Sequence, residues 1–146
     1  MKFVFITDPL VTHYGSASPA LSLSRELQSR GHDVTLISPD VSEDVKHLLT
    51  TYNICTIGLN ERFRVFPIPI FEAWLKALLN RNETLSLAGA FVVNTSSCIV
   101  VGSDVYYAQG PMTRTLDDMV SEMPARYKWT YRLCAWALRR FEKRFV

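Results

Sequence analysis

Blocks of apolar and polar residues along the chain predict strands and helices in turn. Residues 3–6 form a short apolar run that Asp8 and Pro9 end, and such a run is typical of a strand buried on both faces. Apolar residues recur at helical spacing over residues 18–29, and residues 33–38 predict a second strand. A strand, a helix and a strand within about 35 residues favour parallel pairing through a right-handed crossover.

The first predicted helix carries its own start and stop signals. Ser18 is the expected N-cap, and Pro19 suits the first helical turn. Gly31 suits the end of the helix, because glycine adopts a left-handed backbone at no steric cost. The side chains predicted to share its buried face are Ala20, Leu23, Ser24 and Leu27.

The rest of the chain repeats the pattern less regularly. Residues 62–71 contain two prolines and predict an extended, partly exposed segment. Further strands are expected at residues 53–59, 90–97 and 104–111, and further helices at residues 42–51, 71–87 and 112–123 and from residue 126 onward. Together these elements predict an α/β fold, a Rossmann-like, open, mainly parallel sheet with helices on both faces.

Composition narrows the class of protein. A chain of 146 residues with 48% hydrophobic and 21% charged residues is expected to form one globular domain. A net charge of +2 is too small to indicate a nucleic-acid partner. The three cysteines, Cys55, Cys98 and Cys134, are far apart and predict reduced thiols rather than a metal site or a disulfide framework. With no signal peptide and no apolar run of spanning length, the expected location is cytoplasmic.

Gly15 lies in the loop that precedes the first predicted helix, and three interpretations of it remain open. The first is a dinucleotide-binding loop, which would make the chain a small nucleotide-binding domain of oxidoreductase type. Such a loop requires three glycines at G-x-G-x-x-G spacing, and this loop has one. A plain turn glycine is the second interpretation. The third is a loop that a ligand approaches, since the backbone N–H groups at a helix N-terminus attract oxygen atoms.

Two segments carry a resemblance to a known family. Residues 27–38, "LQSRGHDVTLIS", together with the glycine-containing loop before them, are similar to family 4 glycosyltransferases. Residues 92–112, "VVNTSSCIVVGSDVYYAQGPM", also resemble that family, above all members that lengthen lipid-linked oligosaccharides. The ending "RRFEKRFV" resembles the helix before the second domain of such enzymes. Many members have two glycines in the first loop, where this chain has Gly15 and Ser16.

The resemblance implies the GT-B fold, in which two Rossmann-like domains face each other across a cleft. It implies transfer of a hexose from a nucleotide sugar to a glycan or lipid-linked acceptor with retained configuration. The paired glutamates (E-x7-E) of the family's donor site have no counterpart here. Residues 1–146 therefore resemble the acceptor-side domain alone. Its implied partners are a C-terminal donor-binding domain and the acceptor, with no cofactor or metal in this chain. The chain by itself is not expected to complete a transfer.

The resemblance and the loop positions together nominate site residues. The expected substrate-binding residues are Gly15, Ser16, Asn94, Thr95, Ser96, Gln109 and Gly110. His13 and Gln109 are the candidate catalytic groups. A structural interpretation stays open beside each: the polar residues after the strands suit turns, and a loop histidine is commonly solvated.

The last predicted helix has two different faces. Tyr127, Tyr131, Cys134, Leu138, Phe141 and Phe145 recur at spacings of three and four and predict a buried stripe. A second stripe consists of Trp129, Arg132, Trp136, Arg140 and Lys143. Tryptophan beside basic residues suits the headgroup region of an anionic membrane, so a peripheral membrane location is one hypothesis. Packing against a missing domain or a second copy of the chain is the other.

One alternative function follows from that helix. The chain could be a non-catalytic subunit that anchors a separate donor-binding half at a membrane. A nucleic-acid partner is not expected, because the helix carries no recognisable binding motif. Self-association as a homo-oligomer is a further prediction, since half of a two-domain enzyme exposes a cleft wall.

Overall fold

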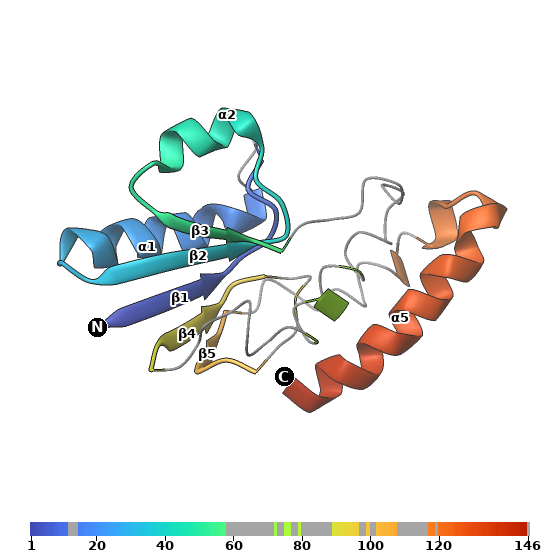
Figure 1. Ribbon diagram of the computed structural model, residues 1–146. Coiled ribbons are helices and arrows are strands. Elements are labelled where there is room, and N and C mark those ends of the chain that lie inside the picture. Colours follow the sequence, from blue (N-terminus) through green and yellow to red (C-terminus); the bar gives the residue numbers. More distant parts are fainter. Residues whose placement is uncertain are drawn as a thin grey trace.

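A five-stranded parallel sheet organises the protein. The computed structural model describes residues 1–11, 15–57, 72, 75–76, 79, 89–96, 99, 102–107, 117–118 and 120–145, with the backbone alone for residues 138 and 141–145. In this part of the chain the strands are β1 (Lys2–Ile6), β2 (Asp33–Ser38), β3 (Asn53–Thr56), β4 (Phe91–Asn94) and β5 (Val105–Tyr106). They lie in the order β3-β2-β1-β4-β5, and each neighbouring pair is parallel (Figure 1). The prediction of an open, parallel, Rossmann-like sheet is confirmed.

Two helical segments lie on the same side of this sheet. They are α1 (Ser18–Ser29), which connects β1 to β2, and α2 (Glu43–Lys46), which continues into a 3₁₀ turn at His47–Leu49 (Figure 1). The helix expected at 42–51 is therefore divided between an α-helical and a 3₁₀ turn. The long helix α5 (Ala125–Phe145) lies away from α1 and α2 (Figure 1).

The central strands are buried on both faces, as the apolar run at residues 3–6 predicts. Phe5 is paired in register with Leu36 and packs in one cluster with Ala20 of α1. The next residue, Ile6, is paired with Ile37, and both are only 1% exposed. Because successive residues of a strand point to opposite faces, burial of both pairs means that both faces of the sheet are covered.

The start of α1 differs from the sequence prediction by one residue. Ala17, not Ser18, is the N-cap, and no side chain makes a capping hydrogen bond. The physical reason is the 3₁₀ turn at Gly15–Ala17, which leads directly into the helix. The predicted buried face is also wrong at one position. Leu23 is 46% exposed, while Leu21 packs against the core.

Gly31 ends α1 as predicted. Its φ of 79° lies in the left-handed region. The N–H of Gly31 donates to the carbonyl of Gln28 at 2.9 Å, and the N–H of His32 donates to the carbonyl of Leu27 at 3.1 Å. This pair of hydrogen bonds is the Schellman motif, which satisfies carbonyls that the end of the helix leaves free. The motif directs the chain into β2.

Several predictions fall wholly or partly outside the described residues. The extended segment at 62–71 and the thiol of Cys98 lie outside them. Of the helix expected at 71–87, residues 72, 75–76 and 79 are described, and they are helical. Of the helix expected at 112–123, residues 117–118 and 120–122 are described and helical.

Candidate functional site

Polar residues gather at the carboxyl ends of β1 and β4, the two neighbouring strands where the strand order reverses. From β1 the sheet continues through β2 to β3 on one side, and through β4 to β5 on the other. Thr7 and Asp8 follow β1, while Asn94 ends β4 and Thr95 and Ser96 follow it. In open parallel sheets, ligands bind at the carboxyl ends of the strands where the order reverses. This edge is therefore the candidate site.

A direct hydrogen bond joins the two strand ends. The Ser96 hydroxyl donates to Oδ1 of Asp8 at 2.6 Å, although 88 positions separate the two residues. The same Ser96 oxygen accepts the backbone N–H of Ile99 at 3.0 Å. Asp8 is 3% exposed and Ser96 is 1% exposed. Because both groups are buried, this contact fixes the loop after β4 against the loop after β1.

Asn94 and Thr95 are also bonded within the protein. The Asn94 amide nitrogen donates to the carbonyl of Ile99 at 2.7 Å, and its amide oxygen accepts the N–H of Ser96 at 2.9 Å. The Thr95 hydroxyl and N–H both donate to the carbonyl of Ile6, at 3.1 Å and 2.8 Å. These contacts agree with the interpretation of the three residues as turn formers. Their contact with a substrate stays a prediction.

The sequence interpretation missed three polar residues of this edge, Thr7, Asp8 and Ser38. Asp8 was expected only to end a strand, and Ser38 was expected only as the last residue of the second strand. The Ser38 hydroxyl contacts the carbonyl oxygens of Asp8 and Asp40, at 3.2 Å and 2.7 Å. The signal was available, since parallel strands bring their carboxyl ends to one edge and each of these residues follows or ends a strand.

Thr7 has a buried hydroxyl at the same edge. The residue is fully buried, and its Oγ1 has no hydrogen-bond partner in the part of the chain that the structure describes. The Thr7 backbone is paired, because its N–H donates to the carbonyl of Ile37 at 2.9 Å. A buried hydroxyl of this kind is the type of group that a water molecule or a ligand oxygen satisfies.

Gly15 and Ser16 lie at the entry to α1, and both are exposed. The first turn of α1 contains no acidic residue, and no side chain caps it. A Cβ atom added at Gly15 meets nothing within 4 Å, and the positive-φ glycines of the described residues are Gly31 and Gly89. Neither backbone strain nor crowding therefore requires glycine at position 15. This weakens the plain turn interpretation.

The other nominated residues of this site cannot be placed beside these groups. His13, Gln109 and Gly110 lie outside the described residues. Within the described part of the chain, no group of three or more His, Cys, Asp or Glu residues could hold a metal ion.

Over the side chains that the structure describes, α5 has a buried and an exposed face as predicted, with Tyr127 half-buried; the side chains of Leu138, Phe141 and Phe145 lie outside the described residues. Tyr131 is fully buried and Cys134 is 7% exposed, whereas Trp129 and Trp136 are 72% and 59% exposed. Burial raises the pKa of the Cys134 thiol above its ordinary value. Burial also raises the pKa of Tyr131, with a smaller contribution from Cys134.

Basic residues accompany the exposed aromatic rings of α5. Arg132 and Arg140 are exposed, and the guanidinium carbon of Arg140 lies 5.7 Å from the ring centroid of Trp136. The side chain of Lys143 is outside the described residues. In the described part of the chain, no helix has the length and apolarity that crossing a membrane requires.

Comparison with known proteins does not assign the chain to a family. The chain matches no protein-family model, and no curated protein and no solved structure matches it. The resemblance to family 4 glycosyltransferases thus rests on the residues quoted above.

Proposed function

We propose that the chain is the acceptor-side domain of a retaining, GT-B-type glycosyltransferase. The enzyme moves a hexose from a nucleotide sugar to a glycan or a lipid-linked acceptor. The observation that carries the proposal is the polar edge where Ser96 bonds to Asp8. It lies where the strand order reverses, beside β1, whose loop leads into α1. The resemblance of residues 27–38 to family 4 supplies the reaction class.

The two loops of this edge have different tasks in the proposed reaction. Asn94, Thr95 and Ser96 are buried, so they position the loop after β4. Gly15 and Ser16 are exposed at the uncapped start of α1, where backbone N–H groups favour an anionic group. A diphosphate that departs from the donor sugar is such an anion, and a fixed dipole aimed at it lowers the barrier.

The first experiment compares the full product of the gene with residues 1–146 alone. Each is incubated with a panel of labelled nucleotide sugars and a polyprenyl-diphosphate glycan, and transfer of label is measured. We expect transfer by the full product and none by residues 1–146. The proposal is contradicted if the full product transfers no label from any donor. It is also contradicted if residues 1–146 bind a dinucleotide tightly.

A substitution at Gly15 tests the role of the α1 entry. In the full product, Gly15→Val places a branched side chain in open space that a ligand is proposed to approach. We expect at least a tenfold loss of transfer, an order-of-magnitude figure based on the effect of a misplaced reacting group. The matched control is Ser29→Val, at the exposed last residue of α1. Equal effects of the two substitutions contradict the assigned role.

A second candidate function, membrane anchoring, is supported by the exposed face of α5. Large apolar side chains at Trp129, Leu133 and Trp136 are 72%, 49% and 59% exposed, and Arg132 and Arg140 lie among them. Aromatic and basic side chains on one helix face suit an anionic lipid surface. This function places the chain, alone or as part of the enzyme, at the membrane that holds a lipid-linked acceptor.

Vesicle co-sedimentation tests the second candidate. We expect the chain to bind vesicles of phosphatidylcholine with phosphatidylglycerol and to bind pure phosphatidylcholine much less. The double variant in which serine replaces both Trp129 and Trp136 should lose most of this binding. The control is Leu23→Ser, which removes an exposed apolar side chain from α1. Membrane binding by a full product that transfers no sugar favours the anchoring subunit over the enzyme. Vesicle binding that depends neither on the charge of the lipid nor on the two tryptophans argues against either membrane role.

A further inference from the structure

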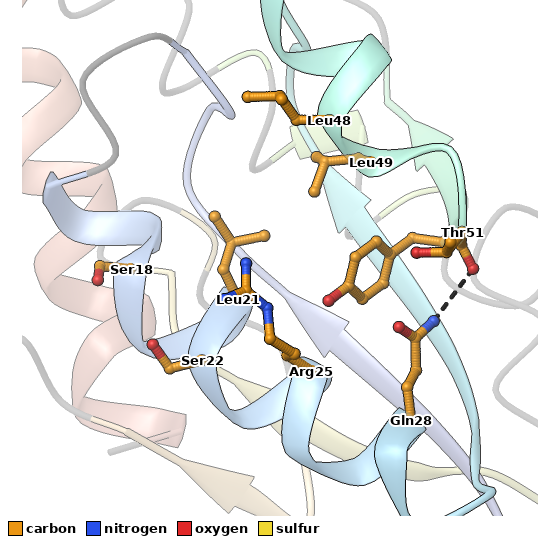
Figure 2. A pocket seen from close by; sticks show the side chains of 9 residues that line it. Ser18, Leu21, Ser22, Arg25, Gln28, Leu48, Leu49 and Thr51 are labelled. Atoms are coloured by element: carbon orange, nitrogen blue, oxygen red, sulfur yellow. Dashed lines mark hydrogen bonds between the residues drawn. The ribbon is translucent and has the colours of Figure 1, made fainter.

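A groove separates α1 from the segment between α2 and β3, away from the polar edge of the sheet. Its cavity volume is about 470 Å³, which lies in the range of small-molecule sites. The residues that line it are Ser18, Leu21, Ser22, Arg25 and Gln28 on one wall and Leu48, Leu49, Thr51 and Tyr52 on the other (Figure 2). None of the residues that join β1 to β4 lines this groove.

The packing of α1 and the adjacent segment explains why the groove has an apolar wall. Leu49 is 6% exposed and belongs to the core, whereas its neighbour Leu48 is 70% exposed. Leu48 thus presents a large apolar surface that the described fold does not cover. At one end of the groove, the Gln28 amide donates to the carbonyl of Thr51 at 3.1 Å (Figure 2). This hydrogen bond holds the two walls at a fixed separation.

Arg25 gives the groove its charge. Among the described residues that line the groove, it is the one charged side chain and none is acidic. Two carboxylates on these helical segments have other partners: Glu26 pairs with Arg30 at 2.7 Å, and Glu43 pairs with Lys46. The Lys46 partner also lowers the pKa of Glu43, through a hydrogen bond first and charge second. Figure 2 shows Arg25 extending from α1 toward Leu21, inside the groove.

We propose that this groove binds a small amphipathic carboxylate. The guanidinium of Arg25 pairs with the carboxylate, for which its planar pair of N–H donors is suited. The apolar body of the ligand covers Leu48 and Leu49 and the ring of Tyr52. Charge complementarity selects an anion, because Arg25 is the charged side chain among the described residues that line the groove. The site does not depend on the function proposed above.

Isothermal titration calorimetry tests the site. The protein of residues 1–146 is titrated with dodecanoate below the critical micelle concentration of dodecanoate. Dodecanol, which has the same chain and no charge, is the comparison ligand. We expect saturable binding of dodecanoate at one site and weaker binding of dodecanol. Arg25→Gln should weaken dodecanoate at least about tenfold and remove the preference for it over dodecanol. Leu48→Ser should weaken both ligands.

The control variant is Arg30→Gln. It removes the same charge from the residue that follows α1, but Arg30 pairs with Glu26 and is not among the described residues that line the groove. We expect it to bind dodecanoate as the parent does. Three outcomes overturn the proposal: no saturable binding, equal losses in Arg25→Gln and Arg30→Gln, or equal binding of dodecanoate and dodecanol by the parent.

Discussion

Substitution of Ser96 by alanine tests whether one hydrogen-bonded group holds the candidate site together. The Ser96 hydroxyl donates to Oδ1 of Asp8 at 2.6 Å and accepts the N–H of Ile99 at 3.0 Å. Alanine removes both contacts and adds no bulk. The backbone of residue 96 is retained, because its N–H bonds to the amide oxygen of Asn94. The substitution therefore acts through the Ser96 side chain, including these two contacts.

The expected cost follows from the burial of the groups left behind. Asp8 is 3% exposed and Ile99 is fully buried, so water does not readily replace the lost hydroxyl. A hydrogen bond to a charged group contributes about 1.5–3 kcal/mol and one between neutral groups about 0.5–1.5 kcal/mol. Loss of both hydrogen bonds leads us to expect a loss of about 2–4 kcal/mol in the free energy of unfolding. This is a large part of the roughly 5–15 kcal/mol that stabilises a typical domain.

Equilibrium unfolding in urea measures the loss. The matched control is Ser29→Ala, because the Ser29 hydroxyl also donates one short hydrogen bond, to the carbonyl of Glu26 at 2.7 Å, but in an exposed position. We expect the control to change the free energy of unfolding by less than about 0.5 kcal/mol. A Ser96→Ala variant as stable as the control would refute the reasoning that this contact joins the two strand ends.

Three further predictions concern single positions. Gly31→Ala should cost about 1 kcal/mol in urea unfolding, because Gly31 has a φ of 79°, and an unchanged stability would contradict the left-handed cap. Gly15→Ala should raise stability by about 0.4–1 kcal/mol, since its site is open and unstrained; a destabilised variant would restore the turn interpretation. Burial raises the pKa of Cys134 from 9.0, so the folded state holds the thiol proton more tightly, and stability should fall as pH rises above that value. Cys134→Ala should show a shallower fall, and a slope equal to that of the parent would contradict the assignment.

The sequence alone was sufficient for the elements whose signals are local. The apolar run of β1, the bounds of β2 and the glycine that ends α1 all follow from patterns within a few residues, and each was predicted correctly. The burial of Tyr131 and Cys134 and the exposure of Trp129 and Trp136 were also predictable, because a helix repeats every 3.6 residues whatever it packs against. Local periodicity could not choose between Leu21 and Leu23, which flank the buried stripe of α1 on opposite sides.

Only the tertiary structure decided which polar groups meet. Sequence patterns indicated that Asn94, Thr95 and Ser96 end a strand, but not that Ser96 bonds to Asp8, 88 positions earlier. That contact requires β4 to pair with β1, and strand order is set by long-range packing rather than by either strand's own residues. The groove beside Arg25 has the same origin. Its two walls come from segments whose separation depends on how each packs against the sheet, a property that neither segment encodes by itself.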